Sequence, residues 1–264
     1  MPSKHARLAS FQHRDWPPLK TTPIVEAVLE LLFGPNETVK MEQIEAFATA
    51  VRERFPLKKP IYEQVLAFKI DPPAASQSVT DIKPVGLELR NTANNRVLLP
   101  RVDRFTISYL PPYISWPALL TDLKTYYEIY KAHVSHGPLV RLGMRYINRL
   151  EISFENQRVD LDEYLKTGPK LPTEYGLEDV VGAYSSNVLI PIPTEDQLCR
   201  ARIHQELPEP KGVVQPMVLD IDVFYAITAP LTWDVIAQRF EIMRQGRNAI
   251  FFGTLTEKAL APYR

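Results

Sequence analysis

Two segments far apart in the chain share one pattern of hydrophobic and polar positions: an alternating strand, a proline, and a helix that opens with Ser or Thr followed by Trp. These segments are 104–110 with Pro111 and Ser115-Trp116, and 222–227 with Pro230 and Thr232-Trp233. The tryptophans stand 233 − 116 = 117 residues apart, close to half of the chain. Repetition over such a distance is typical of a duplicated module. If the two helices pack on the same sheet face, we expect Trp116 and Trp233 to be equivalent core anchors of two similar halves.

The first half reads as strand, helix, strands, helix. Alternation predicts a strand over 24–33, and a period near 3.6 predicts a helix over 41–54 that ends before Pro56. Asn94 and Asn95 predict a tight turn, because Asn tolerates the left-handed conformation. The other predicted elements are strands at 62–70, 85–90, 97–101 and 105–110, a loop at 71–83 that is rich in Pro, Ala and Ser, and a helix capped by Ser115.

The second half repeats this order. Its predicted elements are a long strand at 140–152, a short helix near 160–166, strands at about 181–192, 198–207 and 217–227, and a helix from Trp233. An antiparallel sheet covered by helices on one face is built in this way. The predicted fold is thus α+β, a tandem duplicated strand-helix-strands-helix module. The predicted domains are an N-terminal arm at 1–22, a first repeat at 23–137 and a second repeat at 138–264.

The composition limits the classes of function. The chain has 264 residues, 45% of them hydrophobic, with 31 basic and 31 acidic side chains and one cysteine, Cys199. A formal net charge of zero gives no general attraction to nucleic acid. No run of apolar residues is long enough for a signal peptide or a membrane span, and one cysteine cannot form an internal disulfide. We therefore expect a cytoplasmic protein without a membrane association, and we treat Cys199 as a core residue.

A row of arginines is the strongest local signal after the repeated junction. Alternation along 140–152 places Arg141, Arg145 and Arg149 on one face, opposite a hydrophobic face. Guanidinium groups in such a row suit the carboxylates or phosphates of a large partner. The structural alternative is ion pairing across strands with Glu26 and Glu30.

The predicted hairpin from Cys199 to Tyr225 carries a second group of charged side chains. If residue 202 pairs with residue 222, then His204 lies opposite Asp220, and a histidine oriented by a carboxylate is the start of a general base. No further nucleophile completes a hydrolytic site, and a solvated charged face explains the same residues. The candidate binding residues are therefore Arg141, Arg145, Arg149, Arg200, Arg202, His204, Asp220 and Asp222.

One polar residue interrupts the hydrophobic face of the strand at 140–152. Asn148 stands where the alternation calls for an apolar side chain, and a buried amide must be hydrogen-bonded. We expect it to bind a neighbouring backbone group. The sequence lacks the glycine-rich motifs of dinucleotide, P-loop and serine-hydrolase sites. No catalytic residue, metal site or cofactor is predicted.

Several motifs resemble a sporadically distributed family of uncharacterised prokaryotic proteins. The resemblance rests on Asp103-Arg104-Phe105 with Ser108-Tyr109 and Trp116, on Arg141-Leu142-Gly143-Met144-Arg145-Tyr146-Ile147-Asn148-Arg149, and on the opening Pro17-Pro18-Leu19 with Pro23-Ile24-Val25-Glu26-Ala27. It spans nearly the whole chain and implies no enzyme activity and no catalytic residue. The patchy distribution of that family implies mobile or defence-associated genes, such as phage defence or toxin-antitoxin systems.

Three hypotheses about function follow. The first is a non-enzymatic binding or interaction protein that engages a protein or anionic partner through an exposed sheet face with the arginine row. The second is a sensor that binds a small molecule or nucleotide between the two repeats. The third is a hydrolase-like enzyme that uses His204 with Asp220 or Asp222. By fold analogy alone, the order of elements is similar to the TATA-binding protein and to tandem effector-binding modules of the gyrase-inhibitor type.

Overall fold

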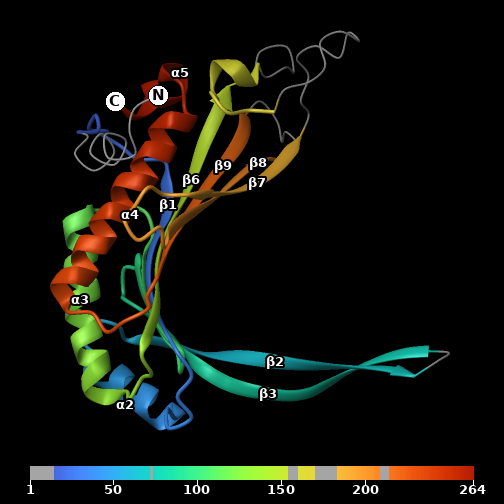
Figure 1. Ribbon diagram of the computed structural model, residues 1–264, viewed down its shortest axis with the longest axis vertical. Helices are drawn as coiled ribbons and strands as arrows, with labels where there is room; N and C mark the ends of the chain where they lie inside the picture. Colours follow the sequence, from blue (N-terminus) through green and yellow to red (C-terminus); the bar gives the residue numbers. More distant parts are fainter. Residues whose placement is uncertain (1–14, 72–73, 154–159, 170–182, 209–213) are drawn as a thin grey trace. The chain divides into compact units, whose positions relative to one another are not determined.

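The computed structural model describes residues 15–71, 74–153, 160–169, 183–208 and 214–264. Within these residues, nine strands form one antiparallel sheet in the order β2-β3-β4-β5-β1-β6-β9-β8-β7 (Figure 1). Four helices pack on this sheet. The predicted α+β class and the antiparallel sheet are confirmed.

Most element boundaries lie within a few residues of the predicted ones. The strands are β1 (Ile24–Phe33), β2 (Leu57–Asp71), β3 (Ala74–Arg90), β4 (Arg96–Pro100), β5 (Arg104–Tyr109), β6 (Leu139–Ser153), β7 (Tyr184–Pro191), β8 (Cys199–Leu207) and β9 (Val214–Ala226). The helices are α2 (Met41–Val51), α3 (Trp116–His133), α4 (Trp233–Thr254) and α5 (Glu257–Leu260), with short 3-10 helices η1 (Leu161–Glu163) and η3 (Ala261–Tyr263). Asn94 has φ of 54° at the predicted turn between β3 and β4.

The chain forms two compact units. One consists of Glu30–Tyr109 and Ile114–Val140, and the other of the N-terminal stretch up to Leu29, Leu110–Tyr113 and Arg141–Arg264. The predicted arm at 1–22 lies outside the described residues up to position 14. The predicted boundaries of the two repeats stay a prediction.

The unit that contains Glu30–Tyr109 has an aromatic core. Phe47 from α2, Phe105 from β5 and Tyr130 from α3 pack together, with ring centroids 5.0 to 5.8 Å apart. Each of the three side chains is fully buried. Helix α3 begins as predicted, because the Ser115 hydroxyl accepts a hydrogen bond from the backbone nitrogen of Ala118 at 3.3 Å.

The unit that contains Arg141–Arg264 has one covered and one open sheet face. Helix α4 packs on β9 and β8 (Figure 1). Burial alternates along β6: Leu142, Met144 and Tyr146 are fully buried, whereas Arg145 and Arg149 are exposed. This period-two pattern sends the hydrophobic residues toward α4 and the charged residues to the other face.

The loop predicted at 71–83 is wrong. The structure continues β3 from Ala74 to Arg90, and β3 pairs with β2 from Leu57↔Arg90 to Asp71↔Ala74. The pairing with β2 satisfies the backbone groups of this segment, so long-range strand pairing overrides a composition that is typical of loops. Pro84 is accommodated where the register shifts next to Tyr62, as expected for a proline in a strand.

The two predicted tryptophan anchors are also wrong. Trp116 and Trp233 are each only half-buried, and neither belongs to the hydrophobic core. Each stands in the first turn of its helix, where one side still faces solvent. The core positions of the two helices come one turn later, at Leu119 in α3 and Ile236 in α4.

The two halves share part of their strand order. In the first half the opening strand β1 lies beside β5, which precedes α3, and in the second half β6 lies beside β9, which precedes α4. They differ elsewhere, because α2 has eleven residues whereas the short helix predicted near 160–166 is the three-residue η1. The duplication stays a prediction.

Candidate functional site

The eight predicted binding residues lie on one sheet face, formed by β6, β9 and β8. Strand β8 pairs with β9 in the predicted register, with Arg202 opposite Asp222 and His204 opposite Asp220. Strand β6 pairs with β9 so that Arg145 is also opposite Asp222. Residues directly opposite in an antiparallel pair share a face. We call this surface the open face; its predicted members are Arg141, Arg145, Arg149, Arg200, Arg202, His204, Asp220 and Asp222.

Arg145 is tied to the sheet by Asp220. Its Nε lies 2.9 Å from Oδ1 and its Nη2 lies 2.6 Å from Oδ2, a bidentate ion pair. Asp220 is only 8% exposed, whereas half of the Arg145 side chain faces solvent. Hydrogen bonds to Asp220 raise the pKa of Arg145, with smaller contributions from the charges of Asp222 and Glu26. The main role of this arginine is therefore to neutralise a carboxylate that the sheet buries.

Arg141 contacts two residues of β9. Its guanidinium carbon is 4.9 Å from the centre of the Phe224 ring, and its Nη2 is 3.4 Å from Asp222 Oδ2. Gly143 stands opposite Phe224 on the neighbouring strand and presents no side chain to block this position. Arg141 therefore combines a cation-π contact with an ion pair.

The structural alternative for the arginine row was ion pairing across strands with Glu26 and Glu30. Asp220 and Asp222 on β9 form ion pairs with Arg145 and Arg141, respectively. Glu30 and Arg104 both belong to the other unit, where Arg104 Nη1 lies 3.4 Å from Glu30 Oε2. Pairing across strands therefore occurs with Asp220 and Asp222 of the second half, and the charge of Glu26 also acts on Arg145.

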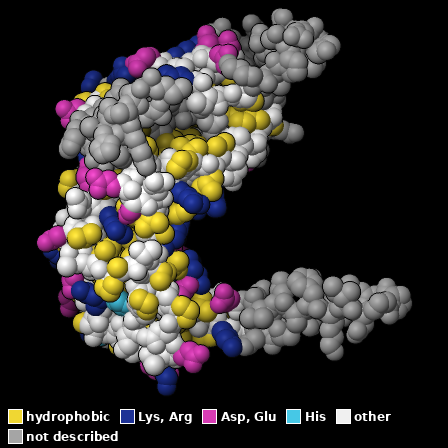
Figure 2. All heavy atoms as spheres, in the orientation of Figure 1, with side chains coloured by type: hydrophobic (Ala, Val, Ile, Leu, Met, Phe, Trp, Pro, Cys, Tyr) yellow, Lys and Arg dark blue, Asp and Glu magenta, His cyan; other side chains and the backbone are white. Residues whose placement is uncertain are grey.

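Three arginines of the open face are held by no carboxylate. Arg149, Arg200 and Arg202 are exposed, and none of them forms an ion pair or side-chain hydrogen bond within the described part of the chain. Figure 2 shows basic, acidic and hydrophobic side chains interspersed over the visible surface of the molecule. The charge of these three guanidinium groups is therefore available to another molecule.

His204 is not oriented by Asp220, although the predicted register is confirmed. Its Nδ1 donates a hydrogen bond to the carbonyl oxygen of Ser186 at 3.1 Å, and its Nε2 lies 3.6 Å from Glu206 Oε2. The carboxylate of Asp220 is occupied by Arg145. The arrangement therefore lacks the hydrogen bond that a histidine general base needs from an orienting carboxylate.

The covered face holds the predicted buried amide. Asn148 is fully buried, and its Nδ2 donates to the carbonyl oxygen of Leu219 at 3.0 Å. The predicted backbone partner is therefore confirmed. Its Oδ1 accepts no hydrogen bond from any described residue, which is costly for a buried carbonyl.

Cys199 is a core residue, as predicted. It is fully buried, and burial raises the pKa of its thiol to about 12. The thiolate is the reactive form of cysteine, so this side chain is inert in the folded protein.

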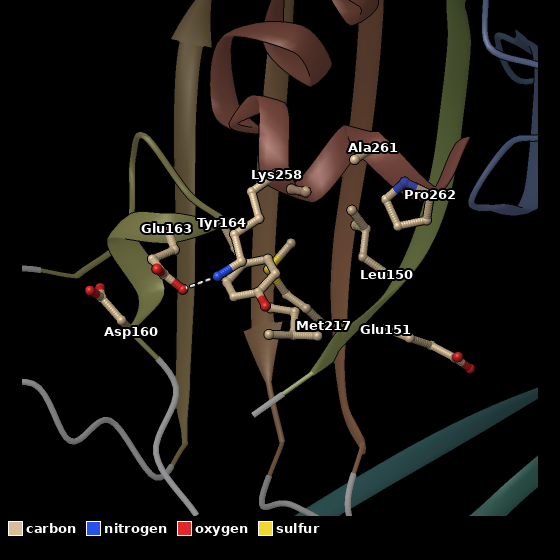
Figure 3. Close-up of a pocket in the computed structure, with 11 residues that line it drawn as sticks. Leu150, Glu151, Asp160, Glu163, Tyr164, Met217, Lys258, Ala261 and Pro262 are labelled. Carbon is tan, nitrogen blue, oxygen red and sulfur yellow. Dashed lines mark hydrogen bonds and ion pairs between the residues drawn. The ribbon is translucent and has the colours of Figure 1, made fainter. Parts of the chain in front are cut away.

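A pocket of about 540 Å³ lies near the C-terminus (Figure 3). Leu150 from β6 and Met217 from β9 form its hydrophobic side, and Lys258 of α5 reaches Glu163 of η1. Lys258 also lies 5.1 Å from the centre of the Tyr164 ring. Because its cation is already bound to Glu163, this pocket offers a weaker charge for a ligand than the open face does.

Some observations limit the chemistry of the described residues. No group of three or more His, Cys, Asp or Glu side chains in the described ranges is arranged to hold a metal ion. No described helix is long and apolar enough to cross a membrane. No protein-family model matches this chain, and a comparison with curated proteins found no similar sequence.

Sequence reasoning missed a second group of polar residues, in α4 and the N-terminal stretch. Gln245 and Asn248 are buried in α4, and Gln245 accepts a hydrogen bond from Trp16 Nε1 at 2.8 Å. The sequence carries a signal for Asn248, a polar residue three positions before Phe251 on the helical stripe, but not for Gln245, which lies five positions after Phe240 and off that stripe. Asn248 is the helical counterpart of the interruption at Asn148.

Proposed function

We propose that this chain is a non-enzymatic interaction protein whose open face binds an acidic surface of a partner protein. The observation that carries the proposal is the set of three exposed arginines, Arg149, Arg200 and Arg202, which have no carboxylate partner among the described residues. Exposed guanidinium groups in fixed positions on strands are suited to bidentate recognition of carboxylates.

The other arginines of the open face are held in place by ion pairs. Arg145 and Arg141 are held by Asp220 and Asp222, so the central row is already neutralised. A partner therefore gains most from Arg149, Arg200 and Arg202 and little from the paired residues. The half-buried side chains of Phe224 and Ile147 supply hydrophobic area between the charges.

A protein partner fits this face better than nucleic acid. Acidic residues share the face with the arginines, including the exposed Glu206 next to His204. A nucleic acid backbone would meet these carboxylates as well as the arginines, which opposes binding. An acidic protein surface also presents basic and neutral groups that match such a mixed pattern.

The experiment purifies three forms of the protein from the native host and compares the molecules that co-purify with each. The three forms are the wild type, an open-face variant and a control variant. One variant carries Arg149→Glu, Arg200→Glu and Arg202→Glu. A matched control carries Arg52→Glu, Lys59→Glu and Lys124→Glu, three exposed basic residues of the other unit. Each set changes the formal charge by 3 × 2 = 6, from 0 to −6.

We expect mass spectrometry to find a partner protein with the wild type and with the control, and to find it lost from the open-face variant. Circular dichroism checks that both variants are folded. A folded open-face variant that keeps every partner would remove the proposal. Loss of the partner after nuclease treatment of the wild-type sample would instead identify a nucleic acid.

A further inference from the structure

A separate pocket lies on the covered side of β6, between the N-terminal stretch and α4. It has a volume of about 220 Å³, and every residue that lines it belongs to the unit containing Arg141–Arg264. Asn148 reaches this pocket from the covered face, whereas its neighbour Arg149 belongs to the open face. The pocket and the proposed partner surface are therefore on opposite sides of the same strand.

The pocket contains buried polar groups that no described residue satisfies. Asn148 is fully buried with a free Oδ1 acceptor, and the Nε of Arg247 is a buried donor without an acceptor. Asn248 is 6% exposed, and its amide forms no hydrogen bond within the described part of the chain. Buried polar atoms are normally paired, so the two at this pocket, Asn148 Oδ1 and Arg247 Nε, indicate a missing hydrogen-bonding molecule.

The pocket is positively charged. No aspartate or glutamate lines it, but Arg244 and Arg247 both do. Arg244 is neutralised by Glu241, with Nε lying 2.8 Å from Oε2. Arg247 has no ion pair in the described ranges and stacks on Tyr146, with its guanidinium carbon 3.9 Å from the ring centre. This stacking holds the guanidinium plane in place and leaves its charge uncompensated.

Aromatic rings form part of the pocket's walls. Trp16 stacks on Phe252 with 5.3 Å between ring centroids and 6° between their planes. Tyr113 also lines the pocket and shares a hydrogen bond of 3.1 Å with Tyr146. Flat walls of this kind favour a planar ligand.

We propose that this pocket binds a small planar aromatic acid that also carries a hydrogen-bond donor. The acid group satisfies Arg247, and the donor satisfies Asn148 Oδ1. A volume of about 220 Å³ lies below the roughly 300 to 1,000 Å³ of sites for drug-sized ligands, so the ligand has a single ring. This site lies within one unit and differs from the predicted ligand site between two repeats.

The probes test the acid group and the hydrogen-bond donor of the ligand one at a time. The purified chain is titrated with 3-hydroxybenzoate and 4-hydroxybenzoate, which carry both the acid and the donor. Benzoate lacks the donor, and 4-hydroxybenzamide lacks the charge. Binding is measured by isothermal titration and by the fluorescence of Trp16, with Trp16→Phe to show which tryptophan responds.

We expect at least one hydroxybenzoate to bind with a dissociation constant below about 1 mM. Benzoate and the benzamide should each bind at least about tenfold more weakly, because one buried group then stays unsatisfied. Arg247→Met should weaken binding at least about tenfold, whereas Arg264→Met, an exposed arginine outside the pocket, should leave it unchanged. If Arg247→Met does not fold, Asn248→Ala serves as the pocket variant.

Two results would overturn the proposal. One is that no hydroxybenzoate binds more tightly than about 1 mM. The other is binding that is equally strong in the pocket variants. Because the open-face variant leaves this pocket intact, failure here is distinguishable from failure of the partner surface.

Discussion

The difference between Arg145 and Arg149 gives the sharpest stability prediction. Both are exposed arginines on the same face of β6, four residues apart. Arg145 makes the bidentate ion pair with Asp220, whereas Arg149 contacts no carboxylate in the described part of the chain. Replacing each with Met keeps an apolar stem in place of the stem of arginine and removes its charged end.

Arg145→Met should lower the free energy of unfolding because it leaves the carboxylate of Asp220 without its cation. Asp220 is 8% exposed and loses the hydrogen bonds that two nitrogens of a cation donate to it. Hydrogen bonds to charged groups contribute about 1.5 to 3 kcal/mol, but half of the Arg145 side chain is in solvent, which reduces this. We expect the free energy of unfolding to fall by about 1 to 2 kcal/mol. Arg149→Met should change it by less than about 0.5 kcal/mol.

The assay is urea unfolding followed by far-UV circular dichroism and by labelling of Cys199, which lies on β8 in the same unit. A double-mutant cycle with Asp220→Asn isolates the pair, and we expect a coupling of about 1 kcal/mol. Equal effects of the two single Arg→Met substitutions, or a coupling of zero, would refute the assignment of Arg145 as a structural residue.

Three further predictions concern other parts of the chain. Burial raises the pKa of Asp196, but hydrogen bonds from Tyr225, Leu198 and Thr194 outweigh it and hold that pKa below its usual value. Asp196→Asn should therefore lower the free energy of unfolding by about 0.5 to 1 kcal/mol at pH 7, since solvent around this exposed side chain screens its interactions. The extra stability of the wild type over Asp196→Asn should be complete at a pH above the unfolded-state pKa of about 3.8. It should disappear as the pH falls through the lower pKa of the folded state, and urea unfolding curves from pH 2 to 7 measure this change. The Cys199 thiol should resist iodoacetamide in the folded protein and react fully in urea; rapid native labelling would show that it is not buried. Gly137→Ala should lower the thermal midpoint of unfolding, because its Cβ would meet the carbonyl oxygen of Gly34 at 2.2 Å. Gly253→Ala in α4 should raise the midpoint, because its Cβ meets nothing within 4 Å and alanine favours a helix. Equal shifts of the two variants in differential scanning fluorimetry would contradict this.

The sequence predicted the elements whose signals are local. Alternation located β1 and β6, and the pairing of Arg202 with Asp222 and of His204 with Asp220 was predicted from the hairpin alone. A hairpin has few registers that keep its hydrophobic residues on one face, so the pattern suffices.

The features that the sequence did not predict depend on contacts between residues far apart in the chain. Segment 71–83 has the composition of a loop, but β2 lies alongside and completes its hydrogen bonds. The partner of Arg145 is Asp220, 75 residues away, and the diagonal contact depends on side-chain reach rather than on direct pairing. The pocket under the N-terminal stretch joins Trp16 to α4 across more than 200 residues, a contact that no sequence period reveals.

The central claim is that Arg149, Arg200 and Arg202 form a surface for an acidic protein partner. The most direct test measures the dissociation constant of the recovered partner for the wild type, the open-face triple Glu variant and the charge-matched control. The account predicts a fall in affinity of at least about 100-fold for the open-face variant, a steep loss of wild-type binding with added salt, and little change for the control. Equal affinities for the wild type and a folded open-face variant would contradict it.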